Sequence, residues 1–519
     1  MTTDITILDY IVFIAFLVGI VLFGSSFYFR NKKKQSTDHF TVAGGNLPSW
    51  VVGMSIFATF VSSISFLGYP GEAYTNNWNP FVFSLSIPIA TWLAAKLFVP
   101  LYRSMNSPSA YHYLEVRFGY WARAYVAICY LLTQLARMGS ILFLLALPLN
   151  FMLGWSVPVL ILVTGISVLI FSSLGGISAV VWTDAIQGII LIVGAVVCAI
   201  LLTVSIPGGF SGLIEVGSQY GKFSLGSLSC SLSEPTFWVL LIYGLFINLQ
   251  NFGIDQNYIQ RYMTARDNRS AQKSTLLGGL LYVPVSLVFV YIGTALFVYY
   301  KTKGVLPEGI SGDQVFPYYI VQALPTGISG LLIASILAAG MSTVSTSLNS
   351  SSTVILTDFY QRIRKREAGE KEGMKILYTS SVVLGVLGMV IALLMMRVDG
   401  VLTTWWKLAS IFSGGMLGLF LLGFLSKTVK NPAAIAGVVA GLLVIAWMSL
   451  SPYLFTEGAL VKYKCNLHGN LTIVLGTTTI FWSDFWCRWP CRLSLKSLKS
   501  LSIKTYKNKS FKQRLSKSL

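Results

Sequence analysis

A crowded run of hydroxyl side chains, LAAGMSTVSTSLNSSST over residues 337–353, follows an apolar stretch that reads as a membrane-spanning helix. Because a membrane helix satisfies its own backbone, so many hydroxyls have little structural purpose there. Ser342, Ser345 and Thr346 share one helix face, and Thr343 lies about 100° around from Ser342. A single membrane serine or threonine usually bonds a carbonyl of its own helix, but four on adjoining faces favour an ion site. Hard monovalent cations prefer neutral oxygen ligands, so the pattern predicts a cation site.

Charged residues inside apolar segments are the next candidates, because they are costly in a bilayer and usually functional. Arg137 lies in the middle of LLTQLARMGSILF, where its guanidinium either pairs within the protein or binds an anionic solute. Asp184 is predicted to open the sixth apolar segment, where an acid often makes only a favourable contact with the helix dipole. Alternatively, Asp184 supplies the negative charge that a cation site made of hydroxyls lacks.

The second apolar segment, WVVGMSIFATFVSSISFLGYPGEAY, is unusually rich in serine and in small residues. This composition is compatible with a helix that is broken near the middle of the bilayer. A broken helix frees carbonyl oxygens to bind ions and solutes. An intact helix whose serines bond their own carbonyls is the alternative.

Composition indicates that the chain lies in a bilayer. It has 519 residues, of which 54% are hydrophobic and only 11% are charged, and its mean hydropathy is +0.69. This is too apolar for a soluble protein and too long for a single anchor, so we predict an all-α, polytopic membrane protein. About thirteen segments are long enough to cross a membrane, at residues 7–29, 50–71, 79–101, 122–150, 155–174, 185–206, 236–254, 276–300, 326–356, 375–397, 404–425, 432–451 and 470–485.

The distribution of basic residues predicts the orientation of these segments. Lysine and arginine gather in every second loop, which the positive-inside rule places in the cytoplasm, so the N-terminus is expected outside a plasma (bacterial inner) membrane. The net charge of +19 is then explained by basic cytoplasmic loops and a basic C-terminal tail, and it does not indicate that the protein binds nucleic acid. The cytoplasmic clusters are predicted at Arg30 to Lys34, at Arg103, Arg117 and Arg123, at Arg261, Arg266, Arg269 and Lys273, at Arg362 to Arg366, and at Lys427 and Lys430.

Several function classes are disfavoured by what the sequence lacks. The six cysteines and three histidines show no metal-site spacing, and the sequence contains no Walker loop, catalytic triad or HExxH motif. This argues against an ATP-driven pump and against a membrane protease, and we expect that the protein is not an enzyme. A broken helix that faces a hydroxyl cluster also fits coupled transport better than a passive channel.

Five spaced blocks of the chain resemble those of the sodium:solute symporter family, which includes sodium-coupled carriers of sugars, sialic acid, proline and pantothenate. The segment GGISAVVWTDAIQG is similar to the family signature, and the resemblance runs from about residue 5 to about residue 450. It implies a core of two inverted five-helix repeats with discontinuous helices. The other blocks are FATFVSSISFLGYPGEAYTNNW, SAYHYLEVRFG, NLQNFGIDQNYIQRY and LAAGMSTVSTSLNS.

The resemblance also implies how the chain is divided. Two inverted repeats form the core, with extra helices at both ends. After the last helix comes a tail rich in serine, lysine and leucine that resembles no family sequence. It is expected to be disordered or to lie on anionic lipid. The expected parts are an extra N-terminal helix and basic loop at 1–49, the first repeat at 50–206, an external loop at 207–235, the second repeat at 236–425, two further helices at 426–485 and the tail at 486–519.

Carried over residue by residue, the resemblance implies two sodium sites, so Na⁺ is the expected coupling ion. These sites use the same residues that the hydroxyl pattern selects independently. The site common to the family would use main-chain oxygens of Ala58, Val61 and Ala339 and the hydroxyls of Ser342 and Thr343. The second site, found in the sialic acid branch, would use Asp184, Ser342, Ser345 and Thr346.

The resemblance further implies a pocket for an acidic solute. Arg137 matches the position that holds the substrate carboxylate in sialic acid carriers of the family, and Ser62 and Ser65 match other pocket positions. Phe60 stands where those carriers have a threonine, and Ser84 stands where they have a glutamine. Both changes replace hydrogen-bonding groups and leave the identity of the acid open. Three residues of the seventh segment are expected either to complete the pocket or to pack between helices: Phe246, Asn248 and Gln250.

Together these features predict a sodium-coupled symporter that imports a small organic solute by alternating access. The expected solute is an acidic sugar similar to sialic acid, or another organic anion. The alternatives are a symporter of neutral sugars or of monocarboxylates and, less favoured, a sensory membrane domain. The expected partners are the solute, sodium ions and the lipid bilayer, with no nucleic acid and no obligate protein partner.

Overall fold

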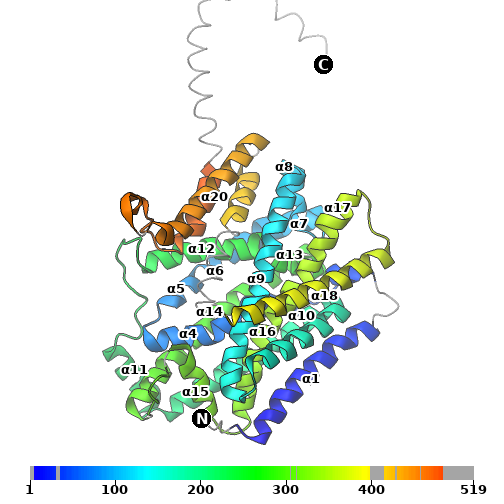
Figure 1. Cartoon of the computed structure of the whole chain (residues 1–519). Coiled ribbons are helices and arrows are strands. Elements are labelled where there is room, and N and C mark those ends of the chain that lie inside the picture. The colour runs from blue at the N-terminus through cyan, green and yellow to red at the C-terminus, as the bar shows by residue number, and fades with distance from the viewer. Residues whose placement is uncertain are drawn as a thin grey trace, which may run out of the picture.

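Helices make up nearly all of the regular structure in the computed structural model of the chain (Figure 1). The structure describes residues 5–30, 36–303, 305–310, 312–397, 414–426, 429–455 and 457–482. Part of the predicted segment 404–425, and the whole of the basic tail, lie outside these residues. The predicted all-α class is confirmed.

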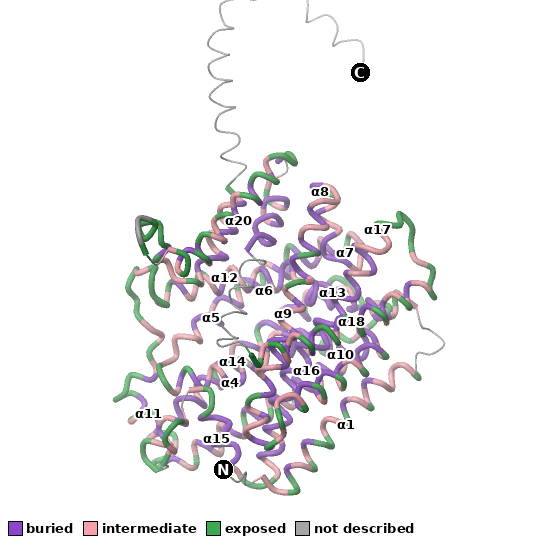
Figure 2. Tube along the Cα trace, in the orientation of Figure 1, coloured by how far each residue is buried: buried purple, intermediate pink, exposed green. Residues whose placement is uncertain are grey.

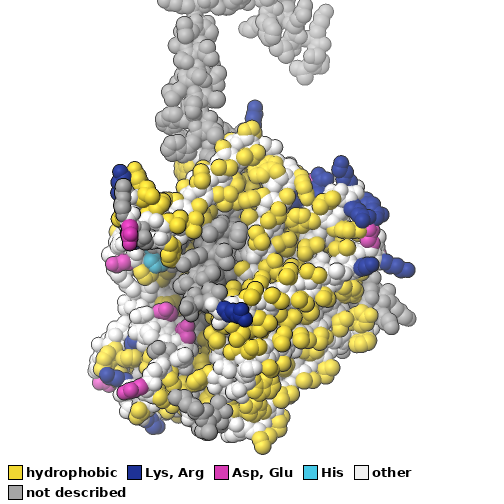
Figure 3. Space-filling model, in the orientation of Figure 1, with side chains coloured by type: hydrophobic (Ala, Val, Ile, Leu, Met, Phe, Trp, Pro, Cys, Tyr) yellow, Lys and Arg dark blue, Asp and Glu magenta, His cyan; other side chains and the backbone are white. Residues whose placement is uncertain are grey.

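The outermost helices expose apolar side chains, as expected where the solvent is lipid. At the edge of the molecule, α1 (Ile7–Arg30) exposes Ile7 by 81% and Leu22 by 65%. Figure 2 shows α1 as mostly intermediate or exposed, whereas the central helices are buried. Rows of exposed valine and leucine also lie on α18 (Glu370–Met395) and α20 (Asn431–Leu454), and hydrophobic side chains dominate the face drawn in Figure 3. Such a surface is stable in a bilayer.

The hydroxyl-rich segment forms the central helix, α16 (Ile328–Val354). Every residue from 332 to 354 is buried. The helix packs against α1, α18, α9 (Tyr120–Leu153) and α10 (Val157–Ser205), and it continues through η6 (Ile355–Tyr360). Its hydroxyls therefore face other protein helices and not lipid.

The fifth and sixth predicted segments, 155–174 and 185–206, are joined without a loop. Both belong to α10, which turns at Gly176, where φ is 58° and ψ is −158°. A Cβ atom added there would lie 3.0 Å from the Phe40 Cα atom, so both the dihedral and the close approach require glycine. The prediction that Asp184 opens a helix is wrong, because after this single turn the chain is helical again well before Asp184. Its predicted helix-start role is thereby excluded.

Within the described residues, two spans consist of a broken helix. The second predicted span consists of α3 (Ser49–Phe60) and α4 (Ser63–Thr75), which are bent by 52° relative to each other. The break expected in this serine-rich segment is confirmed. A second break separates α12 (Phe237–Ile254) from α13 (Gln256–Thr264) at Asp255, whose side chain accepts a hydrogen bond from the first turn of α13. Each predicted five-helix repeat thus begins with a broken helix.

The predicted membrane segments correspond to helices. Within the described ranges, nine helices are long and apolar enough to cross a membrane, and the bent α3–α4 pair is a further span. One of the nine, α10, covers two predicted segments, and the shorter apolar helices Gly414–Leu425 and Leu471–Trp482 account for the two that remain. The other elements are α2 (Thr37–Val42), η2 (Ala43–Gly45), η3 (Asn79–Phe81), α5 (Val82–Leu85), α6 (Ile87–Leu93), η4 (Ala94–Phe98), α7 (Val99–Met105), α8 (His112–Phe118), α11 (Gly209–Gln219), α14 (Asn268–Thr302), η5 (Gly312–Gln314), α15 (Val315–Gln322), α17 (Gln361–Arg364) and η7 (Gly458–Tyr463).

Lys222, in the connection that follows α11, holds the end of the broken helix α4. Its ammonium group donates to the carbonyl oxygens of Tyr74, Thr75 and Asn76 at 2.6, 3.3 and 3.1 Å. It also lies 4.0 Å from the ring centre of Phe297 in α14. The last carbonyls of a helix have no partner within the helix and carry partial negative charge, so a cation is stabilising there.

Replacing Lys222 with methionine should therefore lower the thermal stability of the purified protein by several degrees. The substitution keeps the length of the side chain but removes hydrogen bonds from a charged donor, which are worth roughly 2 kcal/mol together. Lys303→Met is the matched control, because Lys303 is exposed and makes a single long contact of 3.4 Å with the Ser205 carbonyl. Equal melting temperatures for the two variants would contradict the capping role.

Candidate functional site

The four hydroxyl residues that were predicted to bind a cation are all at most 1% exposed. The Thr343 hydroxyl donates to the Ala339 carbonyl at 3.1 Å, and the Ser345 hydroxyl donates to the Ser342 carbonyl at 3.0 Å. Both hydroxyl oxygens keep lone pairs for a further partner. The Ser342 hydroxyl makes no hydrogen bond of standard geometry with the described residues, although it lies close enough to Asp184 to interact with that side chain. An unpartnered hydroxyl at this depth is available as an oxygen ligand.

The broken end of α3 lies against these hydroxyls. Val61 ends this helix, and its amide donates to the Phe57 carbonyl at 3.0 Å. The carbonyls that follow, including that of Ala58, then lack an amide partner within the helix. The Thr59 hydroxyl lies 3.3 Å from the Thr346 hydroxyl of α16. The contact brings the end of α3 to α16, which is the arrangement that the first predicted sodium site requires.

Asp184 takes part in a buried ion pair that the sequence did not predict. Its Oδ2 atom accepts hydrogen bonds from Arg261 Nη2 at 2.6 Å and from Ser55 Oγ at 2.8 Å, and all three residues are 0% exposed. Arg261 also donates from Nη2 to Thr346 Oγ1 at 2.5 Å and from Nε to Ser55 Oγ at 2.7 Å. The Asp184 Oδ1 atom has no hydrogen-bond partner in the described part of the chain. The acid therefore lies beside the hydroxyl cluster, but a guanidinium already occupies one of its oxygens.

The expectation that Arg261 lies in a cytoplasmic basic loop is wrong, because α13 is a buried helix. Its polar residues bond several neighbours: Gln260 donates to Asn349 Oδ1 at 3.0 Å, and Asn257 donates to Gln134 Oε1 at 3.2 Å. The sequence signals this helix but not its burial. Polar residues at 256, 257, 260 and 261 recur at helical spacing, which separates Arg261 from the loop arginines that follow it.

Arg137 lies half-buried in the middle of α9. Its guanidinium makes no hydrogen bond or ion pair within 4.0 Å with any residue that the structure describes. Its charge acts on Tyr130, Asp255 and Tyr258, so it lies close to the break between α12 and α13. The Asp255 side chain accepts a hydrogen bond from the backbone amide of Asn257 at 2.8 Å. Asp255 thus lies near enough to act on Arg137 electrostatically without forming an ion pair, and the two roles predicted for Arg137, pairing within the protein and binding an anion, both stay open.

Phe60 belongs to an aromatic cluster that also includes Tyr258, a neighbour of Arg137. Its ring stacks on Phe252 at 5.3 Å between centroids. It meets the rings of Tyr282 and Tyr258 edge-on at 4.5 and 6.4 Å. The cluster gives the surroundings of Arg137 an apolar, aromatic wall.

The three serines of the predicted pocket lie at different depths. Ser62 and Ser65 are half-buried at the start of α4, where the Ser65 amide donates to the Ser62 hydroxyl at 3.4 Å. Ser84, in α5, is 0% exposed and lies close to Tyr69 of α4. The break in the second span thus places Ser62 and Ser65 directly after Phe60, with Ser84 on a neighbouring helix.

The contacts of α12 favour packing over solute binding for one of its three predicted residues. Asn248 donates to Ser86 Oγ at 2.9 Å and to the Phe83 carbonyl at 3.3 Å, which ties α12 to the neighbouring helices. Phe246 is half-buried against the hydrophobic core. The side-chain oxygen of Gln250 has no hydrogen-bond partner among the described residues, so it keeps a free acceptor.

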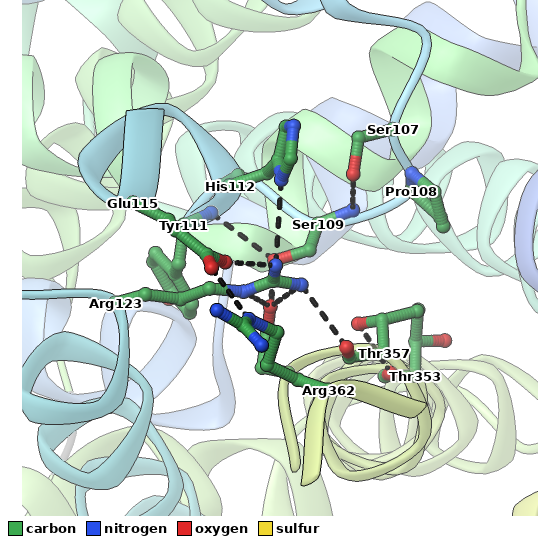
Figure 4. Close-up of polar contacts among 12 residues, drawn as sticks. Ser107, Pro108, Ser109, Tyr111, His112, Glu115, Arg123, Thr353, Thr357 and Arg362 are labelled. Atoms are coloured by element: carbon green, nitrogen blue, oxygen red, sulfur yellow. Dashed lines mark hydrogen bonds and ion pairs between the residues drawn. The ribbon is translucent and has the colours of Figure 1, made fainter. Parts of the chain in front are cut away.

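A second buried charged cluster joins α8 and α9 to the end of the central helix (Figure 4). Arg123 donates to Asp358 Oδ1 at 2.5 Å and to Glu115 Oε2 at 2.7 Å, and Arg362 donates to Glu115 Oε1 at 2.5 Å. Burial alone would raise the pKa of Glu115, but the two guanidinium groups outweigh it and lower that pKa. Each acid here has a basic partner, so we assign the cluster a structural role.

Comparisons with known proteins agree with this geometry. The model of the sodium:solute symporter family matches residues 40–441. The chain is 33% identical to the sodium/sialic acid symporter NanT of Aliivibrio fischeri over 85% of this chain and 87% of that protein. It is 32% identical to the sodium/sialic acid symporter SiaT of Proteus mirabilis over 85% of this chain and 89% of that protein.

Among solved structures, the chain is similar to a Na⁺-coupled sialic acid symporter in a substrate-bound, outward-open state with a novel Na⁺ site. The TM-score is 0.84 at 30% identity, over 92% of this chain and 97% of that chain. This likeness confirms the predicted fold of inverted repeats with discontinuous helices. Since the family match also covers more than half of the sequence, the chain belongs to the sodium:solute symporter family.

Proposed function

We propose that this protein is a sodium-coupled symporter that imports a small organic anion by alternating access. The observation that carries the proposal is the meeting of the broken helix α3 with the buried hydroxyls of α16. Broken helices of transporters bind coupling ions through freed carbonyl oxygens. Membership of the family makes sodium the coupling ion.

The first sodium ion is proposed to bind between α3 and α16. Neutral oxygens suit a hard cation, and both helices offer them away from water. An ion held in this way would tie the broken helix to the central helix, so its binding and release would accompany their relative movement. Its ligands would be the main-chain oxygens of Ala58, Val61 and Ala339 and the hydroxyls of Ser342 and Thr343.

A second sodium ion is proposed beside Asp184. The carboxylate would balance the added charge where hydroxyls alone would bind sodium weakly. Asp184 and Ser342 lie close together, and each keeps an oxygen without a hydrogen bond of standard geometry among the described residues, which supports this site. So does the similar sialic acid symporter, for which a novel Na⁺ site is described. The remaining ligands would be Ser345 and Thr346.

The solute is proposed to be an acidic sugar similar to sialic acid, or another organic anion, held by Arg137. A guanidinium binds a carboxylate through two parallel hydrogen bonds, and the sialic acid symporters named above support an acid. The aromatic wall around Phe60 also suits an acid with an apolar body, so a monocarboxylate is the alternative. A neutral sugar would leave the charge of Arg137 unused.

The orientation is proposed from the distribution of charge. Lysine and arginine side chains gather near α17 in Figure 3, and the positive-inside rule would place that end in the cytoplasm. The N-terminus would then lie outside the bacterial inner membrane. The transport cycle proposed here requires the bilayer but no protein partner.

Replacing Ser342 and Thr343 together with alanine should abolish sodium-driven uptake into proteoliposomes, with a loss of at least about tenfold, because two oxygen ligands disappear. Ser352→Ala is the matched control, since this buried α16 hydroxyl bonds only the Asn349 carbonyl of its own helix, at 2.9 Å. Uptake by the wild-type protein that runs equally well with potassium on both sides would contradict sodium coupling.

Replacing Arg137 with lysine should weaken solute binding about thirtyfold, because the charge is kept but a bidentate contact worth roughly 2 kcal/mol is lost. Calorimetric titration with sialic acids, sugar acids, monocarboxylates and neutral sugars would measure this. Arg266→Lys, in an exposed loop, should change nothing. A neutral hexose as the tightest ligand, or unchanged affinity in Arg137→Ala, would show that Arg137 is structural.

Replacing Asp184 with asparagine should lower the Hill coefficient for sodium from about 2 to about 1, because one of two coupled sites is lost. Uptake driven by the remaining ion should persist, only less concentratively. Glu308→Gln, in an exposed loop, is the control. A hyperbolic sodium dependence of the wild-type protein, with one charge moved per cycle, would mean that Asp184 binds no sodium.

A further inference from the structure

The ion pair between Arg261 and Asp184 joins four helices at the centre of the molecule. Arg261 comes from α13 and Asp184 from α10, while Ser55 of α3 and Thr346 of α16 bond the same guanidinium. None of these residues is more than 1% exposed. The pair therefore connects both broken helices, α3 and α12–α13, to α10 and α16.

The guanidinium uses the same oxygens that a second sodium ion would need. Arg261 Nη2 binds Asp184 Oδ2 at 2.6 Å and Thr346 Oγ1 at 2.5 Å, and both residues belong to the proposed sodium site. A guanidinium group and a sodium ion both seek oxygen lone pairs and negative charge. Two cations that share one carboxylate away from water repel each other strongly.

Arg261 has other contacts that do not involve the carboxylate. Its Nη1 atom donates to the Asn257 carbonyl of α13 at 2.6 Å, and its Nε atom donates to Ser55 Oγ at 2.7 Å. A guanidinium that moves away from Asp184 would thus keep the Asn257 carbonyl of its own helix, whereas Ser55, which also donates to Asp184 Oδ2, bridges the two groups. The Asp184 Oδ1 and Ser342 Oγ atoms give an incoming cation its first two ligands before the arginine has moved.

We propose that Arg261 is an internal cation that competes with sodium for Asp184. The proposal rests on the second sodium site proposed above, and it adds that Arg261 regulates how tightly sodium binds there. Without sodium, the guanidinium neutralises the buried carboxylate. When sodium binds Asp184 and the α16 hydroxyls, Arg261 withdraws toward the Asn257 carbonyl of its own helix. The carboxylate is then never left without a cation, and sodium binding breaks the direct bond between α13 and α10, while Gln260 still joins α13 to α16.

Competition predicts that removing the arginine tightens sodium binding. In the purified full-length protein, ²²Na⁺ binding to Arg261→Gln should show an affinity for the second ion about tenfold higher than in the wild type. Guanidinium chloride added at millimolar concentration to Arg261→Ala should return the affinity toward the wild-type value, because the free cation refills the position. Arg123→Lys, which alters the other buried arginine–carboxylate pair, should leave sodium affinity unchanged.

Weaker or unchanged sodium binding in Arg261→Gln would overturn the proposal, since it would mean that the arginine only positions Asp184 or plays no part. If Arg261→Gln cannot be purified, Arg261→Met gives the same test. Methionine keeps an unbranched side chain but carries no charge, so sodium should again bind more tightly than in the wild type, and weaker or unchanged binding refutes competition. Failure of the second sodium site itself is distinguishable, because Asp184→Asn would then bind as many sodium ions as the wild type.

Discussion

A charge that is buried far from water needs an opposite charge or an ordered set of dipoles beside it, and the centre of this molecule is arranged around that requirement. Two arginines, Arg261 and Arg123, meet it by pairing with carboxylates. Asp9 meets it at a helix N-terminus, where its Oδ1 atom accepts the Gly327 and Gly330 amides of α16 at 2.7 and 2.9 Å. Arg137 is only half-buried and makes no ion pair within 4.0 Å with the described residues, although the charge of Asp255 acts on it, so its hydrogen-bond donors are left for an external anion.

Backbone polar groups at the ends of the broken helices also need partners away from water. A helix that stops inside a bilayer leaves amides and carbonyls unpaired, and these groups need other partners. At the end of α4 the partner is the Lys222 ammonium group, and at the start of α13 it is the Asp255 carboxylate. At the end of α3, by contrast, the freed carbonyls lie beside hydroxyls that are themselves incompletely bonded. The candidate ion site therefore lies where the unpaired carbonyls at the end of α3 adjoin the incompletely bonded hydroxyls of α16.

Much of this arrangement could be predicted from the sequence. Hydropathy identifies the segments that contact lipid, and the run of hydroxyls identifies a membrane helix with an unusual number of polar side chains. The all-α fold, the helices and the break in the second span followed from these signals. The turn at Gly176 was missed because the residues around it, SSLGGIS, are rich in glycine and serine and read as a connection between helices. Arg261 was missed because a charged residue near other basic residues looks like part of a loop. Only the distance to Asp184, remote in the chain, reveals that it is buried.

The complete burial of α16 has a consequence for how the protein is made. The hydroxyl-rich half of this helix would be poorly stabilised by lipid, since its polar side chains find their partners on other helices. Its neighbours α1, α9 and α10 precede it in the chain, whereas α18 follows it, so most of the helices that cover α16 leave the ribosome before it does. The order of synthesis thus suits the order of assembly, because this polar span meets helices that are already in the membrane.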